Sequence, residues 1–328
     1  MGEFELIERF FKRRGRTAAP ATRPAGRAVA LGIGDDCALL TPDAGMQLAI
    51  STDMLVEGRH FLPTVPPRRL GHKALAVNLS DLAACGAEPL GFTLALALPR
   101  ADPAFLEPFA AGLFALADEH GVELIGGDTT AGPLNISVTV LGQVPAGGAL
   151  LRRGARAGDD LWVSGQLGDA RLALEVFRGN VALGAAEFEA ARLAMECPQP
   201  RVALGRALRG LASAAIDLSD GLVGDLGHVL AASNVGAVID ADALPRSAVL
   251  AAQAPALQRQ CVLAGGDDYE LLFTAPPQHR AAVEAAGRLV GVAVTRFGRI
   301  DAAAGLQVHD AGGRAVEMDW RGFDHFAA

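Results

Sequence analysis

The sequence predicts a two-domain α/β (α+β) fold, and three observations support this expectation. The chain has 328 residues, which suits two domains at roughly 150 residues per domain. Short apolar runs that are typical of strands alternate with helical patterns in both halves. Between the halves, glycine and arginine interrupt the apolar pattern over residues 144–160. We therefore expect an N-terminal domain at residues 1–148 and a C-terminal domain at residues 149–328.

The first half begins with an expected amphipathic helix, because the apolar residues of 2–14 recur at helical spacing. Residues 13–27 contain proline, glycine and arginine without an apolar period, so we expect a solvated loop there. Prolines and a glycine bound two further helices, which we expect near 68–85 and 103–120. The remaining apolar runs predict strands at 28–32, 47–52, 92–98, 122–127 and 135–142.

The second half repeats this alternation of strands and helices. A strand is expected at 161–165, followed by a helix from about Asp169 and two more helices before Ser213. Another helix is expected from Gly221, and a helix-strand series closes the chain. The other apolar runs predict strands at 214–219, 235–241 and 270–275. The C-terminal half is therefore also predicted to be α/β.

The composition excludes several classes of function. With 29 basic and 37 acidic residues, the formal net charge of -8 disfavours nucleic-acid backbones and acidic membranes as partners. Lys12 and Lys73 are the only lysines, and neither lies in a Gly-Lys-Ser/Thr sequence. The chain therefore lacks a Walker A motif, and it also lacks the lysine and His-Arg-Asp set of a protein kinase.

The cysteines and the N-terminus indicate a cytoplasmic protein. The four cysteines lack Cys-x-x-Cys spacing, which argues against a thiolate zinc site and against a disulfide scaffold. The N-terminal segment is charged and amphipathic, unlike the uninterrupted apolar stretch of a signal peptide. No segment reaches the ~18 apolar residues of a membrane span, so we expect no membrane partner.

The most informative feature is an aspartate that recurs in short motifs with glycine, serine or threonine, in most cases after an apolar run. Each instance alone is also explained by a turn or a helix N-cap. Together, at the ends of strands, such carboxylates can converge on one cleft. Without histidine or cysteine at ligand spacing, they predict more than one Mg²⁺ ion and a polyphosphate ligand. These aspartates are Asp36, Asp53, Asp81, Asp128, Asp217, Asp220 and Asp267.

Other residues near these motifs have two open interpretations. Gly127 lets backbone amides approach a phosphate, although glycine-rich loops alone are weak evidence. Arg152 is either a phosphate clamp or part of a solvated linker. Asp81 shares a helical face with Asn78, which directs both toward the expected cleft. His60 is either structural or catalytic.

The motifs form an ordered series along nearly the whole chain, including GIGDDCALL, STDMLVEGRHF, GGDDYELLF and the terminal GFDHF. The series resembles the bacterial thiamine-monophosphate kinases, of the ATP-binding superfamily that includes aminoimidazole ribonucleotide synthetase. The resemblance implies that superfamily's fold, with a mixed-sheet N-terminal domain for ATP, metal and homodimerisation and an α/β C-terminal domain. It also implies Mg²⁺-assisted transfer of the γ-phosphoryl group of ATP to thiamine monophosphate, which gives thiamine diphosphate and ADP.

The resemblance further implies roles for single residues. Contacts with thiamine monophosphate are implied for His60, Asp267 and Phe323. Asp267 stands where relatives often have glutamate, and Phe323 where other aromatics occur, so charge and ring are kept. The implied ATP contacts are Gly127, Arg152 and Ser219. The implied metal ligands are Asp36, Ser51, Thr52, Asp53, Asp81, Asp128, Asp217 and Asp220.

No general base is expected for this reaction, because the attacking phosphate oxygen is already ionised near neutral pH. Three other functions are alternatives to this one. A selenophosphate synthetase would need a reactive cysteine and lysine motif near the N-terminal glycine loop, and a hydrogenase-maturation protein would carry a C-terminal cysteine. The chain has neither. A regulatory module that binds MgATP without turnover remains open from the sequence.

Overall fold

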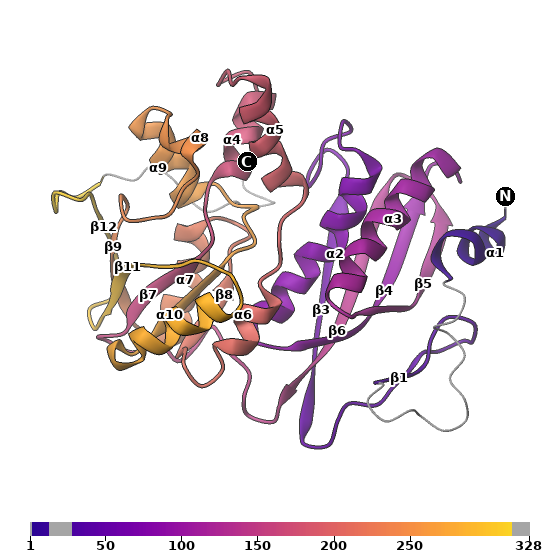
Figure 1. The fold of residues 1–328 in the computed structure, drawn as a ribbon, viewed down its shortest axis with the longest axis horizontal. Helices are drawn as coiled ribbons and strands as arrows, with labels where there is room; N and C mark the ends of the chain where they lie inside the picture. Colours follow the sequence, from indigo (N-terminus) through magenta and orange to yellow (C-terminus); the bar gives the residue numbers. More distant parts are fainter. Residues whose placement is uncertain (1, 13–27, 317–328) are drawn as a thin grey trace. The chain divides into compact units, whose positions relative to one another are not determined.

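The structure, a computed structural model, describes residues 2–12 and 28–316. It divides into two compact units (Figure 1). Unit 1 comprises residues 1–82 and 87–147, and unit 2 comprises residues 83–86 and 148–328. Helices and mixed sheets occur in both units, so the predicted α/β (α+β) fold class is confirmed.

Unit 1 is built on a four-stranded sheet with the strand order β3-β6-β4-β5. β3 (Met46–Val56) and β4 (Glu88–Leu98) pair antiparallel with β6 (Asn135–Pro145), whereas β5 (Glu123–Ala131) pairs parallel with β4. The sheet is therefore mixed. The other elements are α1 (Glu3–Leu6), the π-helix η1 (Ile7–Phe11), β1 (Val29–Leu31), β2 (Leu39–Leu40), α2 (Pro67–Ala84) and α3 (Pro103–Glu119).

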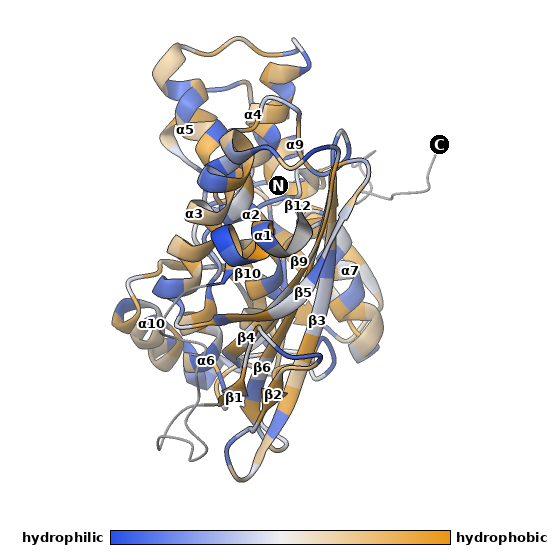
Figure 2. Ribbon diagram, turned by 90° about the vertical axis from the view of Figure 1, so that its right-hand side faces the viewer, coloured by the Kyte–Doolittle hydropathy of each residue, from blue (hydrophilic) through white to orange (hydrophobic). Residues whose placement is uncertain are grey.

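Helices α2 and α3 lie on one side of this sheet, as Figure 2 shows. α3 begins after Asp102, whose side chain accepts a hydrogen bond from the backbone N–H of Ala104. Glycines bring the two helices close together, because a Cβ on Gly71 would lie 2.0 Å from the oxygen of Phe109. A Cβ on Gly112 would likewise lie 1.8 Å from a backbone oxygen of α2. The helices therefore pack with their backbones in contact.

The expected helices near 68–85 and 103–120 agree with α2 and α3. The expected positions of two aspartates are wrong. Asp53 and Asp128 were predicted to follow their strands, but they lie inside β3 and β5. Both strands are only partly buried, so they accommodate the polar residues at 51–53 and 128–130 and continue past the apolar run.

Unit 2 is built on a six-stranded sheet with the order β12-β9-β11-β7-β10-β8. Neighbouring strands are antiparallel except for the parallel pair of β12 and β9. The strands are β7 (Asp160–Ser164), β8 (Ala214–Asp217), β9 (Gly236–Asp240), β10 (Leu271–Ala275), β11 (Val294–Asp301) and β12 (Gly305–His309). The helices are α4 (Asp169–Phe177), α5 (Ala185–Glu196), α6 (Val202–Ala207), α7 (Leu222–Ser233), α8 (Ala248–Ala251), α9 (Pro255–Ala264), the 3-10 helix η2 (Pro277–His279) and α10 (Arg280–Leu289).

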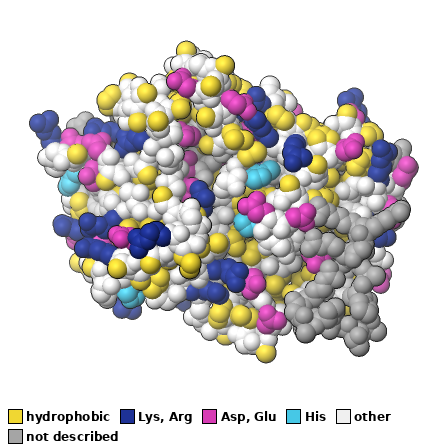
Figure 3. Space-filling model, viewed as in Figure 1, with side chains coloured by type: hydrophobic (Ala, Val, Ile, Leu, Met, Phe, Trp, Pro, Cys, Tyr) yellow, Lys and Arg dark blue, Asp and Glu magenta, His cyan; other side chains and the backbone are white. Residues whose placement is uncertain are grey.

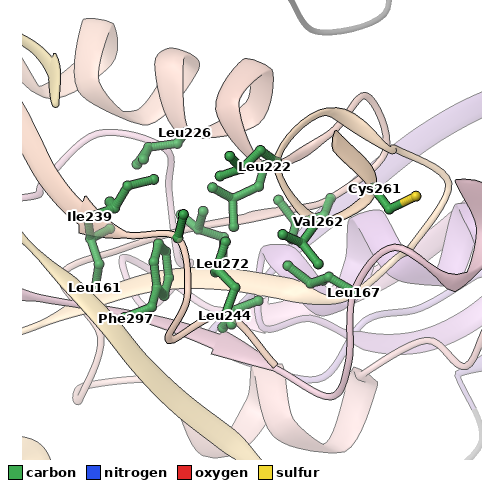
Figure 4. Close-up of a cluster of buried hydrophobic side chains, with 14 of the residues drawn as sticks. Leu161, Leu167, Leu222, Leu226, Ile239, Leu244, Cys261, Val262, Leu272 and Phe297 are labelled. Atoms are coloured by element: carbon green, nitrogen blue, oxygen red, sulfur yellow. The ribbon is translucent and has the colours of Figure 1, made fainter. Parts of the chain in front are cut away.

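The apolar core of unit 2 joins this sheet to its helices (Figure 4). Leu161, Leu272 and Phe297 come from three neighbouring strands, and Leu222 and Leu226 come from α7. All five side chains are at most 2% exposed. Burying an aliphatic or aromatic side chain contributes roughly 1.5–3 kcal/mol. The loops at the ends of β7 and β8 therefore start from a well-packed sheet.

The surface carries both signs of charge. On the face in Figure 3, Lys and Arg side chains are interspersed with Asp and Glu. Several arginines are paired, as Arg280 is with Asp160 at 2.6 Å. Among the helices of the described residues, none is both long enough and apolar enough to cross a membrane.

Candidate functional site

Three of the predicted metal ligands in unit 1 lie where β3 contacts α2. The hydroxyl of Ser51 donates a hydrogen bond to Asp81 Oδ2 over 2.5 Å. The backbone N–H of Asp53 donates to Asn78 Oδ1 over 3.0 Å, and Asn78 Nδ2 donates to the oxygen of Ala74. Asn78 and Asp81 thus share the face of α2 that contacts β3, as their spacing predicts. The structure brings Ser51, Asp53 and Asp81 to one strand-helix contact.

Thr52 does not join this group through its side chain. It is exposed, whereas Ser51 and Asp53 on either side are partly buried. Alternation along the strand places the Thr52 side chain on the opposite face of β3. There its hydroxyl hydrogen-bonds to the hydroxyl of Thr139 over 2.8 Å.

A second group of predicted residues lines a cavity of about 650 Å³ in unit 1. Asp36 lies on its wall, together with Gly127 and Asp128 of β5. Apolar side chains, among them Ile33 and Ile125, form other parts of the wall. Small-molecule sites occupy roughly 300–1,000 Å³ and combine apolar walls with a few polar groups. The cavity therefore suits a ligand with both an apolar ring and a polar, metal-binding part.

Gly127 has a backbone conformation that this cavity wall requires. Its φ angle is +148°, and a Cβ at this position would lie 1.9 Å from the oxygen of Leu94. Leu94 is its partner in the parallel pairing of β4 with β5. Only glycine fits this close approach of two strands, directly before Asp128.

The sequence alone did not predict the part of this wall that η1 and the residue after it provide. Ile7, Glu8, Phe11 and Lys12 line the cavity. Lys12 Nζ forms an ion pair with Glu8 at 2.9 Å. Helical spacing predicts which face of this segment is buried, but it contains no information about the surface on which that face packs.

His60 lies in the turn after β3, and the structure indicates its tautomer. The backbone N–H of Val56 donates a hydrogen bond to His60 Nδ1 over 3.0 Å. An acceptor nitrogen carries no proton, so the neutral ring has its proton on Nε2. His60 is therefore arranged as a donor through Nε2.

In unit 2, the predicted residues come together in two adjacent loops. β10 runs antiparallel to both β7 and β8, so the loop after β8 and the loop before β10 meet at one sheet edge. The backbone N–H of Asp267 donates to the oxygen of Ser219 over 2.8 Å, and that of Tyr269 donates to Leu218 over 2.8 Å. This pairing brings Asp267 close to the segment that contains Asp217, Ser219 and Asp220.

Asp225 is a residue that the sequence analysis missed. Its side chain is 3% exposed, and its Oδ2 accepts a hydrogen bond from the backbone N–H of Asp220 over 3.1 Å. Burial, together with the nearby charge of Asp220, raises the pKa of Asp225 to about 7. Asp225 thus holds the loop that contains the predicted ligands.

Glu270 and Arg201 hold the neighbouring loop and were also missed. Glu270 is 5% exposed and accepts two hydrogen bonds from Arg201, one of them over 2.7 Å from Nε. The hydroxyl of Ser164 donates to the same carboxylate. Asp267 and Tyr269, which precede Glu270, have left-handed φ angles of 63° and 51°. This backbone conformation is unfavourable for residues other than glycine. The buried ion pair helps to maintain this conformation.

Arg152 is exposed, on a segment whose backbone is hydrogen-bonded within unit 2. Phe323 lies outside the described residues. The structure therefore places all the predicted site residues except Phe323.

The donor atoms at the β3–α2 contact fit Mg²⁺ as a partial set of ligands. Over residues 2–12 and 28–316, no group of three or more His, Cys, Asp or Glu side chains could hold a metal ion on its own. Mg²⁺ commonly takes one or two protein carboxylates and completes its octahedron with waters and substrate phosphates. This arrangement needs hard oxygen donors. Asp81 and the hydroxyl of Ser51 offer them, as does Asp53, which lies on the same face of β3 as Ser51.

Comparison with protein families gives two matches. Residues 34–144 match the AIR synthase related protein N-terminal domain, and residues 156–311 match the C-terminal domain of the same family. The chain is 47% identical over 331 residues to the thiamine-monophosphate kinase of Salmonella typhimurium, covering 99% of this chain and 98% of that one. It is 39% identical over 319 residues to that of Caulobacter vibrioides, covering 94% and 87%.

Solved structures give the same result. The crystal structure of thiamine-monophosphate kinase from Stenotrophomonas maltophilia has a TM-score of 0.83 and 48% identity, covering 89% of this chain and 93% of that one. The structure described as AaThiL complexed with AMPPCP and TMP has a TM-score of 0.75 and 31% identity, covering 87% and 89%. The hydrogenase maturation protein HypE of E. coli, at a TM-score of 0.72, 21% identity and coverages of 90% and 93%, shares the fold alone.

Proposed function

Since the chain belongs to the thiamine-monophosphate kinases of the AIR synthase related family, we propose that its aspartates hold several Mg²⁺ ions that serve phosphoryl transfer from ATP. The chain is an ATP-dependent kinase that converts thiamine monophosphate to thiamine diphosphate and ADP. Identity of 47% over nearly the full length of both chains is the observation that supports this assignment most strongly.

The proposed metal ligands lie in both units. When bound, Mg²⁺ neutralises phosphate charge and aligns the donor and acceptor phosphates. No side chain acts as a general base, because the acceptor oxygen is ionised, and the protein contributes binding and alignment. In unit 1 the proposed ligands are Asp36, Ser51, Asp53, Asp81 and Asp128, together with Thr52 through its backbone oxygen, since its side chain lies on the opposite face of β3. In unit 2 they are Asp217 and Asp220.

The proposed contacts of the two substrates differ in chemistry. For ATP, Gly127 offers a backbone that approaches phosphate closely, Arg152 a guanidinium, and Ser219 a hydroxyl. For thiamine monophosphate, His60 donates through Nε2, and Asp267 pairs with the thiazolium cation. Phe323, the third proposed acceptor contact, offers a ring for stacking.

We also propose a cytoplasmic homodimer that uses the N-terminal domain, residues 1–148, with residues 149–328 as the second domain. The outward face of the edge strand β3 supports this, since Leu48, Ile50 and Met54 are 45%, 61% and 54% exposed. Exposed apolar side chains on one face of an edge strand, here with Thr52 between Ile50 and Met54, are unfavourable in water unless another chain covers them. The net charge of -8 is consistent with the absence of nucleic-acid and membrane partners.

A substrate panel tests the function. ADP formation is measured with thiamine monophosphate, thiamine, an aminoimidazole precursor and selenide, each with ATP and Mg²⁺. We expect turnover of thiamine monophosphate only, and loss of turnover with EDTA. Turnover of thiamine in preference to its monophosphate would refute the assignment. Activity that persists without a divalent cation would refute the proposed metal role.

The division of the site between ATP and thiamine monophosphate is tested by kinetics with each substrate varied in turn. His60→Ala and Asp267→Asn are expected to raise the KM for thiamine monophosphate far more than that for ATP. Arg152→Ala is expected to do the reverse. Equal effects on both constants in all three variants would show that the residues are wrongly assigned.

A further inference from the structure

We propose that Ser233 is a positioning residue for ATP, because its hydroxyl fixes the backbone of the loop that presents Arg152. The proposal rests on the role of Arg152 in the proposed function. It concerns a residue at the opposite end of α7 from the predicted ligands, outside all the motifs of the sequence analysis.

The hydroxyl of Ser233 makes three hydrogen bonds to this loop. The backbone N–H groups of Gly154 and Ala155 donate to Ser233 Oγ over 3.1 and 3.2 Å. Ser233 Oγ donates to the carbonyl oxygen of Arg152 over 3.3 Å. A hydroxyl has one donor and two acceptor lone pairs, so backbone groups of residues 152–155 use all of the hydrogen-bonding capacity of Ser233 Oγ.

The loop is also held on either side of these contacts. The backbone N–H of Ala215 in β8 donates to the oxygen of Leu151 over 2.9 Å. Gly154 has a φ angle of +123°, and a Cβ there would lie 2.3 Å from the oxygen of Ser213. The backbone around Arg152 is therefore confined by β8 on one side and by the end of α7 on the other.

Within the part of the chain that the structure describes, the side chains on this confined backbone have no acidic partner. Arg152 and Arg153 are exposed, and neither forms an ion pair with another residue that the structure describes. Other arginines of unit 2 are paired, as Arg201 is with Glu270. A guanidinium held by a fixed backbone and without a carboxylate partner is pre-organised for an anionic ligand such as a nucleotide phosphate.

The length of α7 separates Ser233 from Ser219, so a substitution at one residue does not disturb the loop of the other. The helix runs from Leu222 to Ser233, and 12 residues of α-helix span about 18 Å. Ser219 precedes the start of the helix, so a change at Ser233 acts on the Arg152 loop and leaves the Ser219 loop in place.

The test compares Ser233→Ala with Ser233→Thr, Arg152→Ala and the double variant, by steady-state kinetics and by calorimetric binding of a non-hydrolysable ATP analogue. We expect Ser233→Ala to raise the KM for ATP and the Kd of the analogue about fivefold, since hydrogen bonds that order the loop are lost. The kcat at saturating ATP and the KM for thiamine monophosphate should stay within about twofold. Ser233→Thr retains the hydroxyl and should restore the wild-type KM for ATP. The double variant should bind ATP no more weakly than Arg152→Ala, because Ser233 acts through Arg152.

Ser247→Ala is the matched control. Its hydroxyl also makes two hydrogen bonds in unit 2, to Asp169 and from the backbone N–H of Leu250, at the start of α8. It should lower thermal stability without changing the KM for ATP. The inference is refuted if Ser233→Ala leaves the KM for ATP unchanged while Arg152→Ala raises it. It is also refuted if the double variant raises the KM for ATP by the product of the two single-variant factors. If Arg152→Ala itself has no effect, the nucleotide role of Arg152 fails and the role of Ser233 fails with it, while turnover of thiamine monophosphate still supports the enzyme assignment.

Discussion

At the scale of single residues, we propose that the carboxylates at the β3–α2 contact serve a ligand rather than stability. Asp81 accepts from Ser51, and Asp53 lies on the same face of β3. Carboxylates that share a small region repel one another unless a cation neutralises them. We therefore expect Asp53→Asn or Asp81→Asn to reduce kcat on the order of 100-fold while the melting temperature stays the same or rises.

These variants are measured by turnover as a function of Mg²⁺ concentration and by thermal unfolding in EDTA. Asp102→Asn is the control, because asparagine caps α3 as well as aspartate does. It should leave both readouts unchanged. Near wild-type turnover of the Asp53 or Asp81 variant at limiting Mg²⁺, or loss of activity only through unfolding, would contradict the metal role.

Asp225 gives the protein a pH dependence of stability. Its folded-state pKa of about 7 is above its ordinary value of 3.8. The stability that this group contributes is therefore fully present below 3.8 and is lost as the pH rises through about 7. We expect the melting temperature of the Mg²⁺-free protein to fall from about pH 5 to about pH 8, and Asp225→Asn to flatten this fall.

A carboxylate with the opposite shift is the control for this pH series. Arg259 donates to Asp242 and lowers the pKa of that carboxyl. Asp242→Asn should therefore lower stability while leaving the slope between about pH 5 and about pH 8 as in the wild type. An equal slope in wild type and Asp225→Asn would show that other groups cause the pH dependence.

The sequence contains different amounts of information about these residues. The helical face of Asn78 and Asp81 follows from spacing alone, because the period of a helix is local. Asp225 and Glu270 could not be predicted in the same way. Their roles depend on which loop amides and which arginine lie beside them in space, and one sequence does not specify such long-range partners.

At the scale of elements, helices were easier to predict than strands. Prolines and glycine mark the ends of α2 and α3, so both were expected within about one residue. β3 and β5 extend four residues further than predicted, because strands that are only partly buried accommodate polar residues after the apolar run. Strand order could not be predicted, since pairing is set by contacts between distant segments.

The pairing of β4 with β5 makes a prediction for Gly127. A Cβ there would lie 1.9 Å from the oxygen of Leu94, and the φ angle of +148° disfavours any other residue. Gly127→Ala should displace β5, destabilise the protein by about 3 kcal/mol and abolish activity, because Asp128 moves with the strand.

Gly126→Ala is the matched control in the same strand. Among the described residues, its Cβ would meet only Thr93 Cγ2, at 3.8 Å, which is ordinary contact. It should leave the melting temperature close to that of the wild type. Similar melting temperatures for the two alanine variants would contradict the argument that the close approach of β4 requires a glycine at position 127.

At the scale of the whole molecule, the sequence predicted the mixed α/β class and the kinase family, because ordered motifs recur over nearly the full length of the relatives. It did not identify the apolar row on β3. Leu48, Ile50 and Met54 alternate with Ser51 and Asp53, so one strand has a face toward the predicted ligands and a second face that is exposed in the single chain.

That second face leads to the prediction about assembly. We expect light scattering to give twice the mass of one chain for the wild type, because a second copy covers the row. Ile50 is 61% exposed, and Ile50→Glu places a charge in the middle of the row, which should shift the protein toward the mass of one chain. Leu289→Glu is the control, since Leu289 is 82% exposed on α10 of unit 2, and its change should leave the mass unaltered. A wild type that has the mass of one chain at concentrations where it is active, or an Ile50→Glu variant that retains the doubled mass, would show that this face is not the dimer interface.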